Sequence, residues 1–230
     1  MPPNHSHASS DLMGVEPVIA MLHLHAFRKA HHQHLVLQID AFTIRPGVYW
    51  LRGRNGSGKS SLLTALAGIT AFEGNVHLDQ VSLRQQPVAY RRLVNFAEAE
   101  PIFPPFLTGT ELIQLVKAAK QAPAHQEVFY LDSMGMNDYV NQPVGSYSSG
   151  MLKKLSLVLA FLGQPRCLLL DEPLTTLEVD ALPVLYDWIA RLSQQTQAVV
   201  LLSSHQPLEA GGLLTGPAIV VAQTTIRFTA

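Results

Sequence analysis

The sequence predicts an α/β fold with a central, mostly parallel sheet, an N-terminal antiparallel β subdomain and an inserted helical subdomain. Strand-like and helix-like patterns alternate along the chain, as in parallel sheets that are covered by helices. Two short, wholly apolar runs, Cys167–Leu170 and Ala198–Leu202, are typical of strands buried on both faces. Helical patterns dominate between about residues 100 and 164, which indicates a lobe inserted into the strand-rich core.

The N-terminal part of the chain predicts a leader followed by two strands. We expect residues 1–17 to form a flexible leader, because they are polar and rich in histidine, and residues 18–230 to form a single domain. Val18–Phe27 and Leu35–Ile44 have strand patterns, and Pro46-Gly47 ends the second of them.

Histidines concentrate in this same region. A His-rich tract can bind Zn²⁺ or Ni²⁺, but no acidic or cysteine ligands stand at fixed spacing nearby. We therefore interpret the histidines as parts of a polar leader and a solvated hairpin. They are His5, His7, His23, His25, His31, His32 and His34.

A glycine-rich loop between a strand and a helix predicts a nucleotide site. Val48–Leu51 is an apolar run typical of a buried strand, and Ser61–Gly68 predicts a helix that ends at a glycine. Between them, Gly53–Ser60 fits the phosphate-binding pattern G-x-x-x-x-G-K-[ST]. Glycines let backbone N–H groups turn toward one anion, and the helix N-terminus favours negative charge. The alternative is a glycine-rich turn with a surface lysine.

This loop indicates a P-loop NTPase that binds ATP and Mg²⁺. Lys59 is expected to reach the β- and γ-phosphates, and the Ser60 hydroxyl is expected to hold Mg²⁺. The other candidate nucleotide-binding residues of the loop are Gly53, Asn55, Gly56, Ser57 and Gly58.

The remaining elements follow from periodicity and from turn residues. Gly74–Asp79 alternates as a short strand does, and Tyr90–Phe96 leads into a stretch rich in proline. Val179–Gln194 predicts a helix with Pro183 near its first turn, where proline is tolerated. We expect the helices of the inserted lobe at Thr110–Lys120, Glu127–Met134 and Met151–Leu162, and a final hairpin at Ala218–Ala222 and Thr225–Phe228.

Acidic residues follow the apolar run that ends at Leu170. We expect Asp171 to bind Mg²⁺, directly or through water, and Glu172 to accept a proton from the attacking water or to orient it. The alternative is a strand end capped by solvated acids. His205 follows the next buried strand and is placed to reach the γ-phosphate, because open α/β sheets bind ligands at strand ends. A surface or capping histidine is the alternative there.

A serine-glycine segment, Tyr147–Met151, begins one of the predicted helices. Ser148 or Ser149 can cap this helix, and the free N–H groups at its start form an anion site. One chain cannot easily place two distant helix N-termini on the same phosphate, so a second copy is expected to supply this one across an interface. The alternative is an N-cap and nothing more.

These motifs, in this order and spacing, resemble the nucleotide-binding subunit of an ATP-binding cassette (ABC) transporter. The resemblance covers about residues 18–229. It implies that two such subunits, identical or different, sandwich two ATP molecules and power transport through a separate integral membrane subunit. It also implies a cytoplasmic chain, peripheral on the cytoplasmic face of a membrane.

The resemblance implies roles for individual residues. Ser61 would continue the phosphate loop, Glu172 would be the catalytic base and His205 would be the switch histidine. Ser148 and Gly150 would contact the γ-phosphate that the opposite subunit binds.

The resemblance also implies two roles for aromatic side chains. An aromatic residue upstream of the loop stacks on adenine in the family, and Phe27 is the best candidate, with His31 as the alternative. The segment Pro101–Phe106 corresponds to a region that faces the groove for a helix of the membrane subunit. Alternatively, Phe103 and Phe106 fill the helical lobe's own core.

Three departures from the family pattern bear on turnover. The usual Leu-Ser-Gly-Gly-Gln signature is replaced by Tyr147–Met151, whose Gly-Met ending resembles exporter-type members. Ala99 stands where a glutamine normally meets Mg²⁺ and the attacking water, and Glu178 stands where a loop normally ends in aspartate. The alternative function is therefore a slow or inactive ATP-binding module that switches by dimer closure.

Composition limits the other classes of function. The 230 residues carry a formal net charge of -1, so nothing favours nucleic acid as a partner. The lone Cys167 forms no internal disulfide, which is compatible with a reducing cytosol. No apolar stretch is long enough to cross a bilayer, and the first residues lack the apolar core of a signal peptide.

Two other classes of nucleotide-binding protein rank low. A small-molecule kinase needs neither the Ser-Gly helix start nor Glu172. A DNA-repair member of the ABC proteins needs a long coiled-coil insertion, for which the 89 positions from Lys59 to Ser148 (148 minus 59) leave no room.

Overall fold

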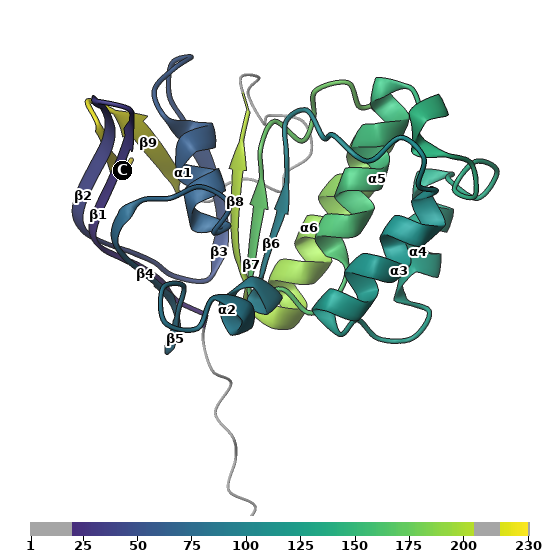
Figure 1. Cartoon of the computed structure of the whole chain (residues 1–230), viewed down its shortest axis with the longest axis horizontal. Helices are drawn as coiled ribbons and strands as arrows, with labels where there is room; N and C mark the ends of the chain where they lie inside the picture. Colours follow the sequence, from purple (N-terminus) through teal and green to yellow (C-terminus); the bar gives the residue numbers. More distant parts are fainter. Residues whose placement is uncertain (1–19, 205–216, 230) are drawn as a thin grey trace, which may run out of the picture.

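The computed structural model of the chain describes residues 20–204 and 217–229, so the leader predicted at residues 1–17 lies outside the described residues. The strands form two sheets, one of four strands in the order β2-β1-β4-β5 and one of six in the order β10-β9-β3-β8-β7-β6 (Figure 1). Their bounds are β1 Leu22–His31, β2 His34–Ile44, β3 Gly47–Arg52, β4 Glu73–Leu78, β5 Val81–Ser82, β6 Val94–Ala97, β7 Cys167–Leu170, β8 Val199–Ser203, β9 Ala218–Ala222 and β10 Thr225–Phe228.

The larger sheet is mostly parallel, as predicted. β3 pairs in parallel with β8 and β9, and β7 pairs in parallel with β6 and β8, whereas β10 runs antiparallel to β9. The pairs within the smaller sheet are antiparallel, which confirms the predicted N-terminal β subdomain. The parallel strands therefore end at one common edge, where the loops that follow them meet.

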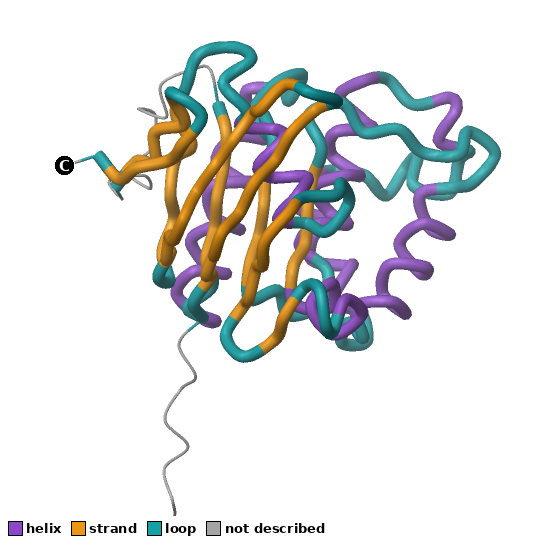
Figure 2. Tube along the Cα trace, turned by 60° about the vertical axis from the view of Figure 1, so that its left-hand side comes forward, coloured by secondary structure: helices purple, strands orange, loops and turns teal. Residues whose placement is uncertain are grey.

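Helices cover the larger sheet on both faces. α1 lies between the two sheets, whereas α3 to α6 lie on the opposite face of the larger sheet (Figures 1 and 2). None of the helices in residues 20–204 and 217–229 is long and apolar enough to span a bilayer. The helix bounds are α1 Lys59–Leu66, α2 Pro87–Leu93, α3 Gly109–Lys120, α4 Gln126–Met134, α5 Ser149–Phe161 and α6 Leu182–Thr196, with 3₁₀-helical turns at Val144–Ser146 and Val179–Ala181.

Two hydrophobic cores fill the spaces between these layers. Leu169 and Leu201 point into a core shared with α1 and the smaller sheet. Leu168 and Leu202 point into a second core shared with α5 and α6. Because successive side chains of a strand point to opposite faces, β7 and β8 are apolar on both faces, apart from Ser203 at the end of β8. This explains the uninterrupted apolar runs in the sequence.

The N-terminal hairpin is present, with bounds that differ from the prediction. β1 was expected to end at Phe27 but continues to His31, which pairs with His34 across a turn. His31, His32 and His34 therefore lie exposed at the tip of the hairpin. Among residues 20–204 and 217–229, no three His, Cys, Asp or Glu side chains gather in a way that suits a metal ion.

A bulge in β1 reverses which side chains face the core. Leu22 and Leu24 point inward, so strict alternation would turn Phe27 outward. Ala26 instead has a left-handed φ of 47°, the register shifts there, and Phe27 is buried. Gly74 makes room for the bulge, since a Cβ on Gly74 would lie 2.0 Å from the Ala26 carbonyl oxygen.

The helical segment agrees with the sequence pattern at most of its bounds. α3, α4 and α5 lie within residues 100–164 and begin and end within two residues of the predicted limits. In the proline-rich segment before α3, Phe106 is exposed, whereas Phe103 packs against the second core. Phe103 therefore belongs to the core of the helical lobe, whereas Phe106 is free to contact a partner.

Candidate nucleotide-binding site

The glycine-rich loop follows β3 directly and ends where α1 begins at Lys59. Gly56 and Gly58 have φ angles of 75° and 103°, which side chains disfavour. A Cβ on Gly58 would lie 2.9 Å from Val36 Cγ1, and one on Gly53 would lie 2.4 Å from Ser57 Oγ. The loop can therefore adopt this conformation only with glycine at Gly53 and Gly58.

The loop borders a cavity of about 450 Å³. Three parts of the chain meet here: the tip of the N-terminal hairpin, the loop with the start of α1, and Glu172 after β7. The cavity thus contains most of the predicted site and has the size of a small-molecule pocket. The lining residues are His31, His34, Val36, Asn55, Gly56, Ser57, Gly58, Lys59, Ser60, Ser61 and Glu172.

Polar groups of the loop are arranged to bind an anion. Lys59 is buried, and its Nζ donates to the carbonyl oxygens of Gly53 at 2.9 Å and Arg54 at 3.3 Å. Ser57 Oγ is also buried and has no hydrogen-bond partner within the part of the chain that the structure describes. A buried hydroxyl without a partner costs free energy unless a ligand or water satisfies it. Together with the helix N-terminus behind the loop, these donors fit a phosphate group.

The two predicted carboxylates lie at the end of β7. Asp171 is buried, its N–H donates to the Ala97 carbonyl oxygen at 2.9 Å, and its Oδ1 accepts from Ser203 Oγ at 2.6 Å. The same Ser203 oxygen accepts from the Glu172 N–H at 2.9 Å. Ser203 was not singled out from the sequence as a site residue, although it precedes the predicted His205. The parallel register, which pairs Leu170 with Leu202, could have indicated it.

Lys153 is a second polar side chain that the sequence reasoning missed. It is only 1% exposed, and its Nζ donates to the carbonyl oxygens of Glu98 at 3.0 Å, Ala99 at 2.5 Å and Glu172 at 3.3 Å. Burial lowers the pKa of Lys153, while nearby carboxylates, Asp171 foremost, oppose that shift. Its position one helical turn before buried Leu157 could have indicated that it faces inward.

The expectation for Phe27 is wrong. Its side chain is 0% exposed, and its ring stacks on Phe72 at a centroid distance of 5.0 Å inside the core. A buried ring offers no face to adenine. The alternative candidate, His31, lines the cavity, and its Nε2 lies 3.1 Å from Ser61 Oγ. His205 lies outside the described residues, so its predicted role stays a prediction.

The serine-glycine segment lies apart from the cavity in this chain, since none of its residues lines it. Ser148, rather than Ser149, is the N-cap of α5, and its Oγ accepts from the Met151 N–H at 3.2 Å. A Cβ on Gly150 would approach the Thr176 carbonyl oxygen to 3.1 Å. Ser148 is exposed in this chain.

The segment after Glu172 is tied to α5 by an ion pair. Lys154 Nζ lies 2.7 Å from Glu178 Oε2. The hydrogen bond and charge of Lys154 lower the pKa of Glu178. The longer side chain at this position, noted as a departure in the sequence, is thus engaged within its own chain.

Comparison with known proteins agrees with this geometry. The family model described as ABC transporter matches residues 37–175. The chain is 31% identical to rat "ATP-binding cassette sub-family A member 7", over 77% of this chain and 8% of that protein. It is 30% identical to "Putative 2-aminoethylphosphonate import ATP-binding protein PhnT" of Salmonella paratyphi A, over 81% of this chain and 52% of that protein. The chain thus spans about half, or far less, of the length of these relatives.

Solved structures show the same fold. "Structure of ATP binding subunit of ABC transporter" superposes with a TM-score of 0.82 at 22% identity, covering 91% of this chain and 90% of that one. The dimeric ATP-binding cassette MJ0796, in a post-hydrolysis state bound to ADP and Pi, has a TM-score of 0.76 at 17% identity, covering 90% and 97%. With the glycine loop, the paired carboxylates and the family match in agreement, this chain belongs to the ABC transporter family, as an ATP-binding cassette.

Proposed function

We propose that the chain binds ATP and Mg²⁺, closes on a second nucleotide-binding subunit, and hydrolyses ATP to power transport through a separate membrane-spanning partner. The observation that carries this proposal is that Glu172 lines the same cavity as the phosphate loop, Asn55 to Ser61. A general base must lie within reach of the reacting phosphate, directly or through one water.

We assign each residue at or beside the cavity a role in binding phosphate, binding Mg²⁺ or moving a proton. The N–H groups of the loop and Lys59 would hold the phosphates, and Glu172 would take the proton of the attacking water. Ser60 and Asp171 provide the oxygen ligands that Mg²⁺ prefers and would hold the ion. When bound, Mg²⁺ neutralises part of the phosphate charge. His31 replaces Phe27 as our candidate for stacking on adenine.

The second subunit would complete the site. We propose that Ser148 and Gly150 contact the γ-phosphate bound by the opposite subunit, because the start of α5 offers free N–H groups to an anion. His205 is proposed to sense the same phosphate. The family resemblance supports both roles.

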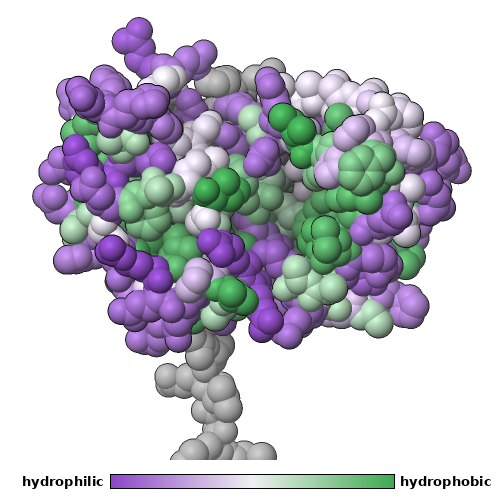
Figure 3. All heavy atoms as spheres, viewed as in Figure 1, coloured by the Kyte–Doolittle hydropathy of each residue, from purple (hydrophilic) through white to green (hydrophobic). Residues whose placement is uncertain are grey.

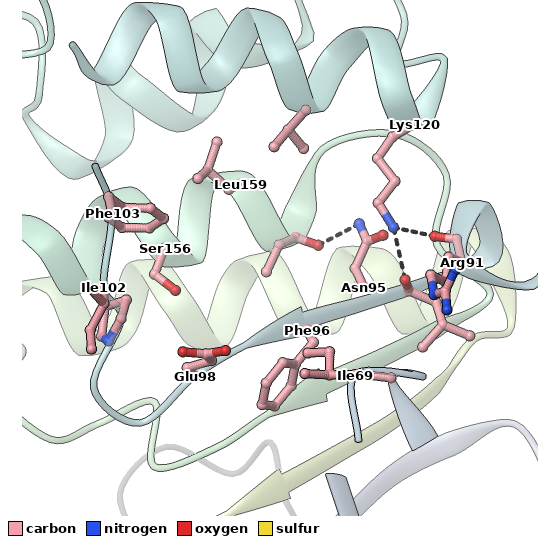
Figure 4. A pocket seen from close by; sticks show the side chains of 15 residues that line it. Ile69, Arg91, Asn95, Phe96, Glu98, Ile102, Phe103, Lys120, Ser156 and Leu159 are labelled. Carbon is pink, nitrogen blue, oxygen red and sulfur yellow. Dashed lines mark hydrogen bonds between the residues drawn. The ribbon is translucent and has the colours of Figure 1, made fainter. Parts of the chain in front are cut away.

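A groove beside the helical lobe is our candidate for the membrane partner. Hydrophobic side chains surround a hollow on this face (Figure 3), and the cavity measures about 310 Å³. Arg91 and Lys120 lie at one end, and Glu98, Ile102 and Phe103 lie at the other (Figure 4). Ile102 is 89% exposed, so an apolar partner surface would remove it from water. We propose that a helix of the partner docks here, which would place the chain on the cytoplasmic face of a membrane.

A steady-state phosphate-release assay tests the proposal. The wild-type chain should release phosphate faster than Glu172→Gln, in which the proton acceptor is lost while the phosphate contacts remain. Release no faster than the variant, with ATP still bound, would favour the slow binding module instead. Ala99→Gln is a useful third arm, since a glutamine restored there should raise turnover if alanine limits it.

The direction of transport stays a prediction. The Gly-Met ending of the signature favours export, whereas the relatives named above include a protein named for import. The cargo is not assigned by these residues either. Identification of the membrane protein that co-purifies with the chain from a detergent extract would settle the partner.

A further inference from the structure

The backbone of Glu172 adopts an uncommon conformation. Its φ is 45°, in the left-handed region, although it is not a glycine. Such a conformation is unfavourable for a residue with a Cβ, so the surrounding structure must hold it in place. Glu172 is also the proposed base, and strained backbone conformations cluster at active sites.

Ser203 holds the peptide group on the N-terminal side of Glu172. It is 0% exposed and lies at the end of β8, beside the end of β7. Its single hydroxyl proton goes to Asp171 Oδ1 at 2.6 Å, and its oxygen accepts the Glu172 N–H at 2.9 Å. One hydroxyl therefore fixes both the Asp171 carboxylate and the peptide plane between the two acids.

Lys153 holds the peptide group on the C-terminal side. Its ammonium donates to the Glu172 carbonyl oxygen and to the carbonyl oxygens of Glu98 and Ala99. An ammonium has three protons, and these three acceptors use all of them. Removing such a charge from water is costly, and the cost is offset here by carbonyl oxygens from two separate loops.

The two contacts together define the conformation of Glu172. The peptide planes before and after a Cα set its φ and ψ, and here each plane is bonded to a buried side chain from another element. We propose that Lys153 and Ser203 form a clamp on the Glu172 backbone that keeps it left-handed and directs its carboxylate toward the phosphate loop. This inference rests on the proposed function, in which Glu172 is the base. Both are positioning residues, since they act through Glu172.

The test compares clamp variants with matched controls. Ser203→Ala removes the hydroxyl, Ser203→Thr keeps it, and Lys153→Met removes the ammonium. Ser82→Ala is the serine control, because Ser82 is also buried, donates to Asn75 Oδ1 and accepts from the Gln85 N–H.

The lysine control is Lys29→Met. Lys29 is only 5% exposed and donates to the Ala71 carbonyl oxygen at 2.7 Å, away from the carboxylates. Both controls therefore report the cost of losing a buried polar group without touching Glu172.

The expected result separates turnover from binding. Ser203→Ala and Lys153→Met should lower kcat by about 10- to 100-fold, as for a misplaced catalytic group, while the Kd for ATP stays at the wild-type value. Ser203→Thr and the two controls should retain kcat. Clamp variants that keep wild-type kcat would overturn the inference. If Lys153→Met does not fold, Ser203→Ala decides.

A readout independent of turnover distinguishes this inference from the proposed function. If the wild-type chain hydrolyses no ATP, the proposed function fails, and crystal structures of the variants still decide whether the clamp exists. Glu172 should leave the left-handed region in Ser203→Ala and in Lys153→Met but not in the controls. A positive φ at Glu172 in both clamp variants would refute the clamp.

Discussion

At the scale of single residues, we expect ATP binding to depend most on the side chain of Lys59. Its ammonium is already held within the loop by two carbonyl oxygens, so its position is set by the loop itself. Lys59→Ala should weaken ATP binding by about 10- to 100-fold, since a charge-assisted hydrogen bond to phosphate is lost. Isothermal titration calorimetry measures this. Lys117→Ala, which removes an ion pair with Glu127 in the helical lobe, is the control, and unchanged affinity in Lys59→Ala would refute the phosphate-loop assignment.

Lys120 should make stability depend on pH in an alkaline window. Burial lowers its pKa from 10.5 to about 8, while its Nζ donates to the carbonyl oxygens of Arg91 and Val94. Between about pH 8 and 10.5 the unfolded chain binds more protons at this group than the folded chain does. The contribution of Lys120 to the free energy of unfolding should therefore rise with pH across that window and be constant below it.

The measurement is the difference in free energy of unfolding between wild type and Lys120→Met, taken by urea denaturation from pH 7 to 10. Tyrosines that titrate near the upper end are common to both proteins and cancel in the difference. A difference that does not change with pH would contradict the lowered pKa.

At the scale of elements, the start of α5 shows which of two serines stabilises the helix. Ser148 Oγ accepts the Met151 N–H, and Ser149 is the first helical residue. Ser148→Ala should cost about 1 kcal/mol of stability, and Ser148→Asp should retain most of it. Ser149→Ala is the matched control. Thermal unfolding without nucleotide measures this cost, and equal losses in both alanine variants would mean that the cap contributes nothing.

The strands show which features sequence patterns predict and which features they miss. β7, β9 and β10 have the predicted bounds, because apolar runs between turn residues leave little freedom in their limits. β1 is displaced by four residues at each end, since its histidines look like turn or tail residues in the sequence. The bulge at Ala26 then reverses the alternation and buries Phe27, which the family resemblance had pointed to as the adenine-stacking residue. Bulges depend on the partner strand, here on Gly74, which local patterns do not contain.

The site was predictable to the extent that its chemistry resides in motifs. Lys59, Asp171 and Glu172 are recognisable because their types and spacing are set by phosphate and metal chemistry. Lys153 and Ser203 are not, because their partners are backbone atoms of loops distant in sequence. Any side chain of suitable length and burial can make such bonds, so they have no sequence pattern of their own.

At the scale of the whole molecule, we propose that the exposed start of α5 completes the nucleotide site of a second subunit. Glu172→Gln should accumulate as an ATP-bound dimer, because the interface contacts remain while the proton acceptor is lost. Light scattering at saturating ATP should show twice the monomer mass for this variant. The double variant Glu172→Gln with Lys59→Ala is the control and should stay monomeric, since it binds ATP poorly. Monomer alone in both would count against the sandwich.

The three hydrogen bonds of Lys153 Nζ have a consequence for coupling between the groove and the nucleotide site. The side chain of Glu98 borders the partner groove, and its carbonyl oxygen shares one ammonium with Glu172. A displacement of the Glu98 backbone must either lengthen its hydrogen bond to Lys153 Nζ or move the ammonium group with it. Because coupling between two binding sites is reciprocal, binding of a partner at the groove would change the affinity for ATP by the same factor as ATP binding would change the affinity for the partner. The coupling would pass through a single side-chain nitrogen, Lys153 Nζ.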